Sequence, residues 1–427
     1  MMATVAEWGG QLRAGTVSVE SLVEDALAAA DRAQALNAFV TVDADGARAA
    51  ARTAAAELAD GVDRGPLHGI PVVVKDMLDT RGLRTTMGSR HFADRVPTED
   101  AELVRRLRDG GAVVLGKTTT HEFAYGPTGD RSANGPARNP HDPGRMSGGS
   151  SAGAAVAVAA GVVGLSIGTD TGGSVRVPAA CCGVVGFKPT HGVLDTRGAF
   201  PLAPSLDTLG VLAGSVADCA LFWRFMTGTA EASSTPAPRI GWVSPEQLHP
   251  TDPRVTDTAL GMLARFDKAE VRLPFVEELR WSYRAIQSWE ATGIHAQRMA
   301  DAPELFDAEV LARLRDAATV THDDYERAAR HRDAAHRAFD LLWQQHDLLA
   351  LPTVPITAPP IGVRQLPLGD TTIDVRAALL SLTSPFSVLG LPALSVPAGL
   401  VDGLPVGLQL VAPRGQEQKL LNFADQL

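Results

Sequence analysis

The sequence has few cysteines, no run of basic residues and no apolar segment long enough to span a membrane. Only three of its 427 residues are cysteines, and two of these, Cys181 and Cys182, are adjacent. Such usage does not suit a disulfide framework and is typical of a reducing compartment, where free cysteines serve as small core residues. The most apolar window, residues 152–167, is shorter than the ~20 residues that a membrane-spanning helix needs.

Charge and targeting signals exclude further classes of protein. The formal net charge of −10 argues against a nucleic-acid partner. The first residues, MMATVAEWGGQLRAG, contain no apolar run typical of a signal peptide, so we expect a cytoplasmic protein that binds a small molecule and neither nucleic acid nor membrane. Ligands on a metal-binding helix lie three or four residues apart. No pair in the late charged segment has that spacing, so we expect no metal there; its histidines are His322, His331, His336 and His346.

Alternating helical and strand patterns predict an α/β fold with a largely parallel sheet. The residues Ser21 and Glu24 resemble a capping box for the first helix. The stretch at 127–145 is dense in Gly, Pro, Asn and Asp and is expected to be a loop. The predicted elements are helices over 18–30, 44–58, 101–109 and 152–165, and strands over 70–74 and 112–115.

No linker-like change of composition divides the chain, so we expect one domain over residues 1–427. A polar segment at 229–238, TAEASSTPAP, is expected to be a surface loop. The expected parts are N-terminal helices over 1–65, a core over 66–228, a mostly helical region over 229–345 and a C-terminal part of the core over 346–427. The family resemblance described below implies that the core over 66–228 is the catalytic core and that the region over 229–345 lies on the substrate side.

Candidate catalytic residues gather in a glycine-rich stretch at 147–190, SGGSSAG followed by GTDTGGSVRVPAACCGVVGFKPT. Glycine lets backbone N–H groups approach a ligand closely, so Ser174 after two glycines predicts a hydroxyl exposed beside amide donors. Upstream, Lys75 ends the apolar run GIPVVVK. It is either a salt-bridged lysine, for example with Asp76, or a desolvated amine that acts as a base near pH 7.

Other serine and phosphate motifs fit less well. GSSAG matches G-x-S-x-G with Ser151 at its centre, but the residues before it, DPGRMSG, are loop-like, whereas that motif follows a strand. Neither glycine-rich turn ends in Gly-Lys-Ser/Thr, and none of the five lysines follows a serine by three positions. A Ser/Ser/Lys arrangement remains.

Several blocks in this order resemble the amidase signature family: GIPVVVKD, GGSS, GTDTGGSVRVPA, CGVVGFKPT and GLPVGLQLVAP. The resemblance implies an α/β/α sandwich around a mixed, mostly parallel sheet, catalysis by Lys75, Ser150 and Ser174, and no metal or organic cofactor. It also favours a homodimer. The family usually continues GGSS with two glycines, whereas Ala152 and a glycine follow here; one added methyl is not expected to disturb the serines.

The remaining candidates surround this catalytic set. We expect Ser174 to attack an amide carbonyl while neutral Lys75 removes its proton through Ser150. The backbone of Thr171, Gly172, Gly173 and Ser174 would form an oxyanion hole. Tyr125 is placed in the substrate pocket and His121 is expected to be structural. The supporting residues are Ser151, Asp170 and Arg176; Arg176 would pair with Asp170 or bind a substrate carboxylate.

Two alternative functions use the same residues. The first is the amidase subunit of a glutamine-dependent tRNA amidotransferase, which works in a complex. The second is an acyltransferase or esterase with the same acyl-enzyme. The apolar group Phe222, Trp223 and Phe225 suits either a helix buried in the monomer or a dimer interface.

Overall fold

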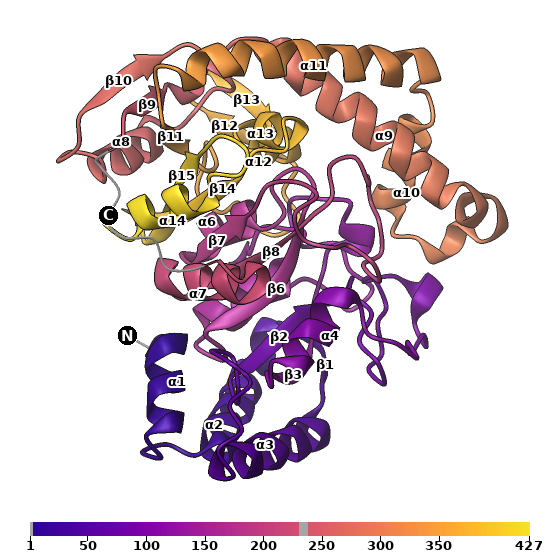
Figure 1. The fold of residues 1–427 in the computed structure, drawn as a ribbon. Helices are drawn as coiled ribbons and strands as arrows, with labels where there is room; N and C mark the ends of the chain where they lie inside the picture. Colours follow the sequence, from indigo (N-terminus) through magenta and orange to yellow (C-terminus); the bar gives the residue numbers. More distant parts are fainter. Residues whose placement is uncertain (1–2, 230–237) are drawn as a thin grey trace.

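One large mixed sheet forms the centre of the molecule in the computed structural model, which describes residues 3–229 and 238–427 (Figure 1). Its strand order is β1-β3-β2-β6-β8-β7-β14-β15-β11-β9-β10. The strands are β1 (Phe39–Val42), β2 (Pro71–Lys75), β3 (Val113–Thr118), β6 (Leu165–Asp170), β7 (Val185–Lys188), β8 (Thr208–Ala213), β9 (Ile240–Val243), β10 (Lys268–Val271), β11 (Leu348–Pro352), β14 (Ala393–Val401) and β15 (Leu404–Val411).

The α/β fold with a mixed central sheet is confirmed, but the share of parallel pairing is lower than expected. Four neighbouring pairs are parallel, within β3-β2-β6 and β11-β9-β10. The other six are antiparallel and include the whole middle of the sheet. Strand periodicity reveals a buried strand but not its direction, since direction depends on how the connecting segments cross the sheet.

Helices cover this sheet. Helices α5 and α6 pack against each other and against the middle strands, whereas α7 packs with α1 and α14 and also contacts the sheet. The helices are α1 (Val5–Arg13), α2 (Val19–Arg32), α3 (Ala44–Ala59), α4 (Glu102–Asp109), α5 (Ala152–Ala159), α6 (Arg176–Cys182), α7 (Val216–Thr227), α8 (Pro253–Gly261), α9 (Val276–Asp301), α10 (Ala308–Ala317), α11 (His322–Trp343), α12 (Val375–Ser381), α13 (Ser384–Val388) and α14 (Glu417–Ala424).

The predicted helical region is present. Figure 1 shows α9, α10 and α11 in orange, on the opposite side of the molecule from α1, α2 and α3 in indigo. α9 packs against both α10 and α11, and it also contacts α13 next to the sheet. The division into four parts stays a prediction, and most of the expected surface loop, residues 230–237, lies outside the described residues.

Three local predictions were wrong. Ser18, not Ser21, caps α2 by accepting a hydrogen bond from the Ser21 backbone, and Glu24 instead binds Arg48. The expected loop at 127–145 contains a short antiparallel pair, β4 (Arg138–Asn139) with β5 (Asp142–Met146). The helix expected over 152–165 ends at Ala159. A second small pair joins β12 (Gln365–Leu368) to β13 (Thr371–Asp374).

The apolar group on α7 belongs to the interior. Phe222 and Trp223 are buried, and Trp223 packs edge-on against Phe187 of β7 at a ring separation of 5.8 Å. This burial removes the surface that a dimer interface at these side chains would need, so the homodimer stays a prediction without that support. Among the described residues, no helix is long and apolar enough to cross a membrane.

Candidate active site

Lys75 is the last residue of β2 and is completely buried. Its Nζ lies 2.8 Å from Oγ of Ser150 and donates to Oγ1 of Thr169 at 2.6 Å. Burial lowers the pKa of Lys75 to about 7, against smaller opposing effects of the Asp170 and Asp207 charges. A large fraction of the amine is therefore neutral at neutral pH and can accept a proton from a hydroxyl.

The salt-bridge interpretation of Lys75 is wrong. The carboxylate of Asp76 is used elsewhere, because it accepts hydrogen bonds from the backbone and hydroxyl of Thr86. Within the described part of the chain, Lys75 forms no ion pair. Its polar neighbours are hydroxyl groups, which solvate the neutral amine without fixing its positive charge.

Backbone contacts hold the two serine segments together. The Ser150 carbonyl accepts hydrogen bonds from the His121 backbone and the Thr120 hydroxyl. The Ser151 backbone N–H donates to the Ser174 carbonyl at 3.1 Å. The Ser151 hydroxyl binds the backbone of Thr169 on β6, at 3.2 and 3.3 Å. The two glycine-rich turns therefore meet at the end of β2 and β6, with the Ser150 hydroxyl at Lys75 and the Ser151 backbone at Ser174.

Ser174 follows two glycines at positions where a larger residue does not fit, because neighbouring side chains occupy the space. A Cβ on Gly172 would lie 2.1 Å from the Tyr283 hydroxyl, and one on Gly173, where φ is +147°, would lie 2.3 Å from Oγ1 of Thr383. Among the described residues, the N–H groups of Gly172, Gly173 and Ser174 donate no hydrogen bond, and the Ser174 hydroxyl has no partner. Three adjacent free donors beside a free hydroxyl suit a developing oxyanion.

Asp170 and Arg176 form the ion pair that the sequence analysis expected. The two side chains are completely buried and bind at 2.8 and 3.0 Å, and Asp170 also accepts from the Val175 backbone. The remaining guanidinium hydrogens bind Gln409, Ser387 and the Thr383 carbonyl. Because these contacts use the whole guanidinium, Arg176 has no donor left for a substrate carboxylate.

Thr171 and Tyr125 have different neighbours. The Thr171 hydroxyl donates to Asp207 at 2.6 Å, and burial raises the pKa of Asp207. A cavity of about 130 Å³ lies here and is lined by Thr169, Thr171 and Asp207 together with apolar side chains. Tyr125 is buried under the guanidinium of Arg313, 4.0 Å from its ring centre. His121 is buried in contact with Thr128 at 3.5 Å.

Three residues at the site were missed by the sequence analysis. Thr169 is the second partner of Lys75, Thr383 donates to the Gly172 carbonyl at 2.6 Å, and Tyr283 closes over the same glycine. Thr169 lies inside the recognised GTDTGGS block, so a hydroxyl next to Asp170 near the end of β6 was a usable signal. Thr383 and Tyr283 come from α-helical regions far along the chain, and no local pattern marks them.

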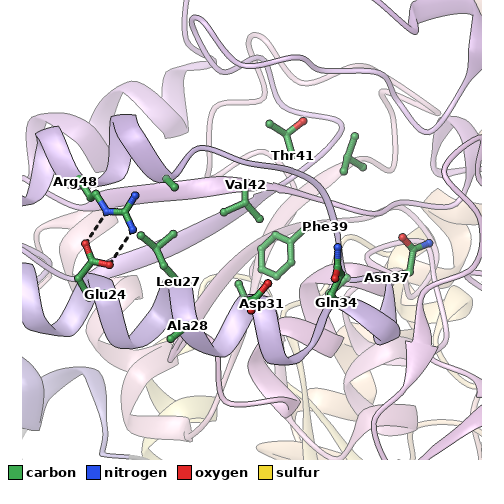
Figure 2. Close-up of a pocket in the computed structure, with 14 residues that line it drawn as sticks. Glu24, Leu27, Ala28, Asp31, Gln34, Asn37, Phe39, Thr41, Val42 and Arg48 are labelled. Carbon is green, nitrogen blue, oxygen red and sulfur yellow. Dashed lines mark hydrogen bonds and ion pairs between the residues drawn. The ribbon is translucent and has the colours of Figure 1, made fainter.

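Other candidate features lie apart from these residues. A cavity of about 680 Å³ between α2, β1 and α3 is shown in Figure 2, where the Glu24–Arg48 ion pair lies at its rim, and none of its lining residues is a candidate catalytic residue. The cysteines Cys181, Cys182 and Cys219 are buried and free. In the described ranges, no group of three or more His, Cys, Asp and Glu side chains is placed to hold a metal ion.

Known proteins resemble this chain over nearly its full length. The family described as Amidase matches residues 21–421. One subunit of the glutamyl-tRNA(Gln) amidotransferase of Synechococcus sp. (strain WH7803) is 37% identical, covering 99% of this chain and 96% of that protein. The AtzE subunit of the 1-carboxybiuret hydrolase of Pseudomonas sp. (strain ADP) is 35% identical, covering 96% and 94%. A solved amidase crystal structure superposes with a TM-score of 0.94 at 36% identity, covering 99% of this chain and 98% of that one.

Proposed function

This chain belongs to the amidase family of carbon–nitrogen hydrolases, and we propose that it cleaves a linear carboxylic amide through an acyl-enzyme on Ser174. The single observation that carries this proposal is the buried contact of 2.8 Å between Lys75 Nζ and Ser150 Oγ, next to a segment whose N–H groups are free. An amide carbonyl is a poor electrophile, so its attack needs both an activated hydroxyl and a stabilised oxyanion.

Acylation begins with proton transfer. Neutral Lys75 accepts a proton from Ser150 as Ser150 accepts one from Ser174, and the Ser174 oxygen attacks the carbonyl carbon. The negative charge of the tetrahedral intermediate is bound by the N–H groups of Gly172, Gly173 and Ser174, with Thr171 completing the turn. Each such donor is worth roughly 3 kcal/mol of barrier.

Breakdown of the intermediate reverses the proton path. The Lys75 ammonium returns its proton through Ser150 to the nitrogen of the amide, the carbon–nitrogen bond breaks, and ammonia or an amine leaves. Water then loses a proton to the same relay, attacks the ester on Ser174 and releases the carboxylate. Neither step uses a metal or an organic cofactor.

Support for a fixed active site comes from its buried surroundings. Asp170 and Arg176 hold the turn before Ser174, and Thr383 binds the Gly172 carbonyl. Such support keeps the free N–H groups in place before substrate binds, which is what electrostatic stabilisation of a transition state requires.

The names of the relatives favour a second candidate function. Several relatives are subunits of glutamyl-tRNA(Gln) amidotransferases, at 34–37% identity. In that case the chain would release ammonia from glutamine within a complex, and the same Ser174 acyl-enzyme would form. The two candidate functions use the same catalytic residues and differ in whether the chain needs partner chains.

Ammonia or amine release by the purified single chain tests the proposal. The panel comprises aliphatic amides, aryl amides, glutamine and the matching esters, with Ser174→Ala as control. Turnover of simple amides that falls at least ~10³-fold in the variant supports a self-sufficient amidase. Activity on glutamine that appears only with added partner chains supports the amidotransferase candidate. Unchanged turnover in the variant contradicts the proposal.

A further inference from the structure

The peptide plane between Gly172 and Gly173 carries one of the free N–H groups of the oxyanion turn. In a trans peptide, which this one is, the carbonyl and the N–H point in opposite directions within one plane. A partner that binds the Gly172 carbonyl therefore also sets the direction of the Gly173 N–H. Because glycine places few limits on its backbone angles, a plane between two glycines depends on outside contacts for its orientation.

Two successive peptide planes of the turn are held at their carbonyl ends. The plane between Gly173 and Ser174 is held locally, since the Gly173 carbonyl accepts a hydrogen bond from the Val177 backbone at 2.7 Å. Among the described residues, the Gly172 carbonyl has no backbone donor. Its partner is the hydroxyl of Thr383 at 2.6 Å, from a segment 211 residues away. Loss of this one contact would therefore release the plane that carries the Gly173 N–H.

Thr383 is itself fixed in position. It is completely buried between α12 and α13. Its carbonyl accepts a hydrogen bond from Arg176 at 3.1 Å, and the neighbouring Leu382 carbonyl accepts one from Gln409 at 2.7 Å. Arg176 also donates to the Gln409 side chain at 2.7 Å, and both side chains are buried. The chain at Thr383 is thus anchored to α6 and β15.

The Thr383 hydroxyl has two carbonyls within reach but only one hydrogen to donate. Its Oγ1 atom lies 2.6 Å from the Gly172 carbonyl oxygen and 3.3 Å from that of Leu380. Only the shorter distance falls in the usual range for hydrogen bonds between oxygen atoms, so the hydrogen goes to Gly172. A Cβ on Gly173 would collide with the same Oγ1 atom. Thr383 therefore lies directly against both residues of the plane.

We propose that Thr383 is a positioning residue of the oxyanion hole, whose hydroxyl aims and polarises the N–H of Gly173 through the carbonyl of Gly172. This inference rests on the proposed function, since it concerns the oxyanion of the same reaction. A hydrogen bond accepted by an amide carbonyl strengthens the N–H of that amide as a donor. The gain is largest once negative charge has developed on the substrate oxygen, so Thr383 stabilises the transition state more than the bound amide.

The test removes the hydroxyl with little change of shape. For the amides that the wild type hydrolyses, Thr383→Val is expected to lower kcat by roughly 10- to 100-fold with little change in KM, because the donor is misaligned but still present. Thr383→Ser keeps the hydroxyl and should restore most of the activity. The matched control is Ser381→Ala on α12, which is expected to behave as the wild type, since this buried hydroxyl donates only to the Ala378 carbonyl.

Labelling of Ser174 by a neutral fluorophosphonate is a second readout that needs no known substrate. The phosphoryl oxygen of this reagent takes the place of the developing oxyanion, so the labelling rate should fall in Thr383→Val and recover in Thr383→Ser. Rates refer to the folded fraction, which denaturant unfolding measures. If Thr383→Val does not fold, Thr383→Cys replaces it, because a thiol is only a weak donor and should give an intermediate loss.

The outcomes separate this inference from the proposed function. Losses in kcat and labelling rate that Thr383→Ser reverses support the inference. Wild-type rates in folded Thr383→Val or in its Thr383→Cys replacement, equal losses in Thr383→Ser, or a raised KM at unchanged kcat would overturn it, while hydrolysis that depends on Ser174 leaves the amidase proposal standing. If the wild type neither labels at Ser174 nor hydrolyses any amide, the proposed function fails and this inference fails with it.

Discussion

The Nζ atom of Lys75 lies 2.8 Å from the Oγ atom of Ser150, and burial lowers the pKa of this lysine to about 7. The short distance and the lowered pKa have the same cause. The apolar surroundings of β2 exclude water from the amine, so only hydroxyl groups are left to bind it. A charged ammonium would be costly here, whereas a neutral amine is a competent base.

The pH dependence of activity is the first prediction. Only neutral Lys75 accepts a proton, and the neutral form increases as pH rises, so kcat/KM is expected to rise through an apparent pKa near 7 and to level off above it. A pH–rate profile from pH 5 to 9 measures this. Lys188 is the control, because burial also lowers its pKa to about 7 while its Nζ binds only the Pro189 carbonyl. Lys188→Met should keep the ascending limb of the pH–rate profile. Loss of this limb in that variant would mean that Lys188, and not Lys75, sets the apparent pKa near 7.

Replacing Ser150 interrupts the proton path without removing the nucleophile. Ser150→Ala is expected to lower kcat by roughly 10² to 10⁴, the usual contribution of general acid–base catalysis, because Lys75 then has no hydroxyl between it and Ser174. Ser174 should still react with a fluorophosphonate, only more slowly. A Ser151→Ala variant provides the comparison, since that hydroxyl binds only the Thr169 backbone. Equal losses in both variants would argue against a relay through Ser150.

Stability should depend strongly on the Asp170–Arg176 pair. Asp170→Asn leaves Arg176 charged and completely buried, which typically costs about 3–5 kcal/mol of unfolding free energy. Denaturant unfolding measures the change. The exposed pair of Asp195 and Arg197 is the control, and Asp195→Asn is expected to have no measurable effect. Similar stabilities of the two variants would mean that the buried pair does not hold the fold.

The glycine before the nucleophile turn cannot carry a side chain. In Gly172→Ala the new Cβ would lie 2.1 Å from the Tyr283 hydroxyl, so either the buried Tyr283 ring or the turn with its free N–H groups must move. Activity is expected to fall by at least ~10²-fold, comparable to loss of one oxyanion donor. Gly261→Ala in α8, where a Cβ meets nothing within 4 Å, should retain full activity. An active Gly172→Ala enzyme would remove this turn from the mechanism.

The features that the sequence predicted correctly are those that depend on local residue patterns. The run ending at Lys75 and the glycine-flanked serines have strong local signatures, because buried strands and glycine turns follow from local pattern. The resemblance to the amidase signature family was needed to join Lys75, Ser150 and Ser174 into one predicted catalytic set. The Asp170–Arg176 pair was expected for the same reason, since the two residues lie close together in the chain.

The remainder depends on contacts between distant segments. Thr383 binds the Gly172 carbonyl across 211 residues, and Arg364 binds Asp130 across 234. Such pairs are fixed by topology, which periodicity does not reveal. The antiparallel middle of the sheet was missed for the same reason.

The most direct measurement of the central claim is the mass of the trapped acyl-enzyme. The protein is mixed with a slowly hydrolysed activated ester, quenched in acid, and analysed as intact protein and as peptides. We predict an added acyl group on the peptide that contains Ser174, absent in Ser174→Ala and accumulating more slowly in Ser150→Ala. An acyl group on another residue, or full turnover by Ser174→Ala without any covalent adduct, would contradict the account.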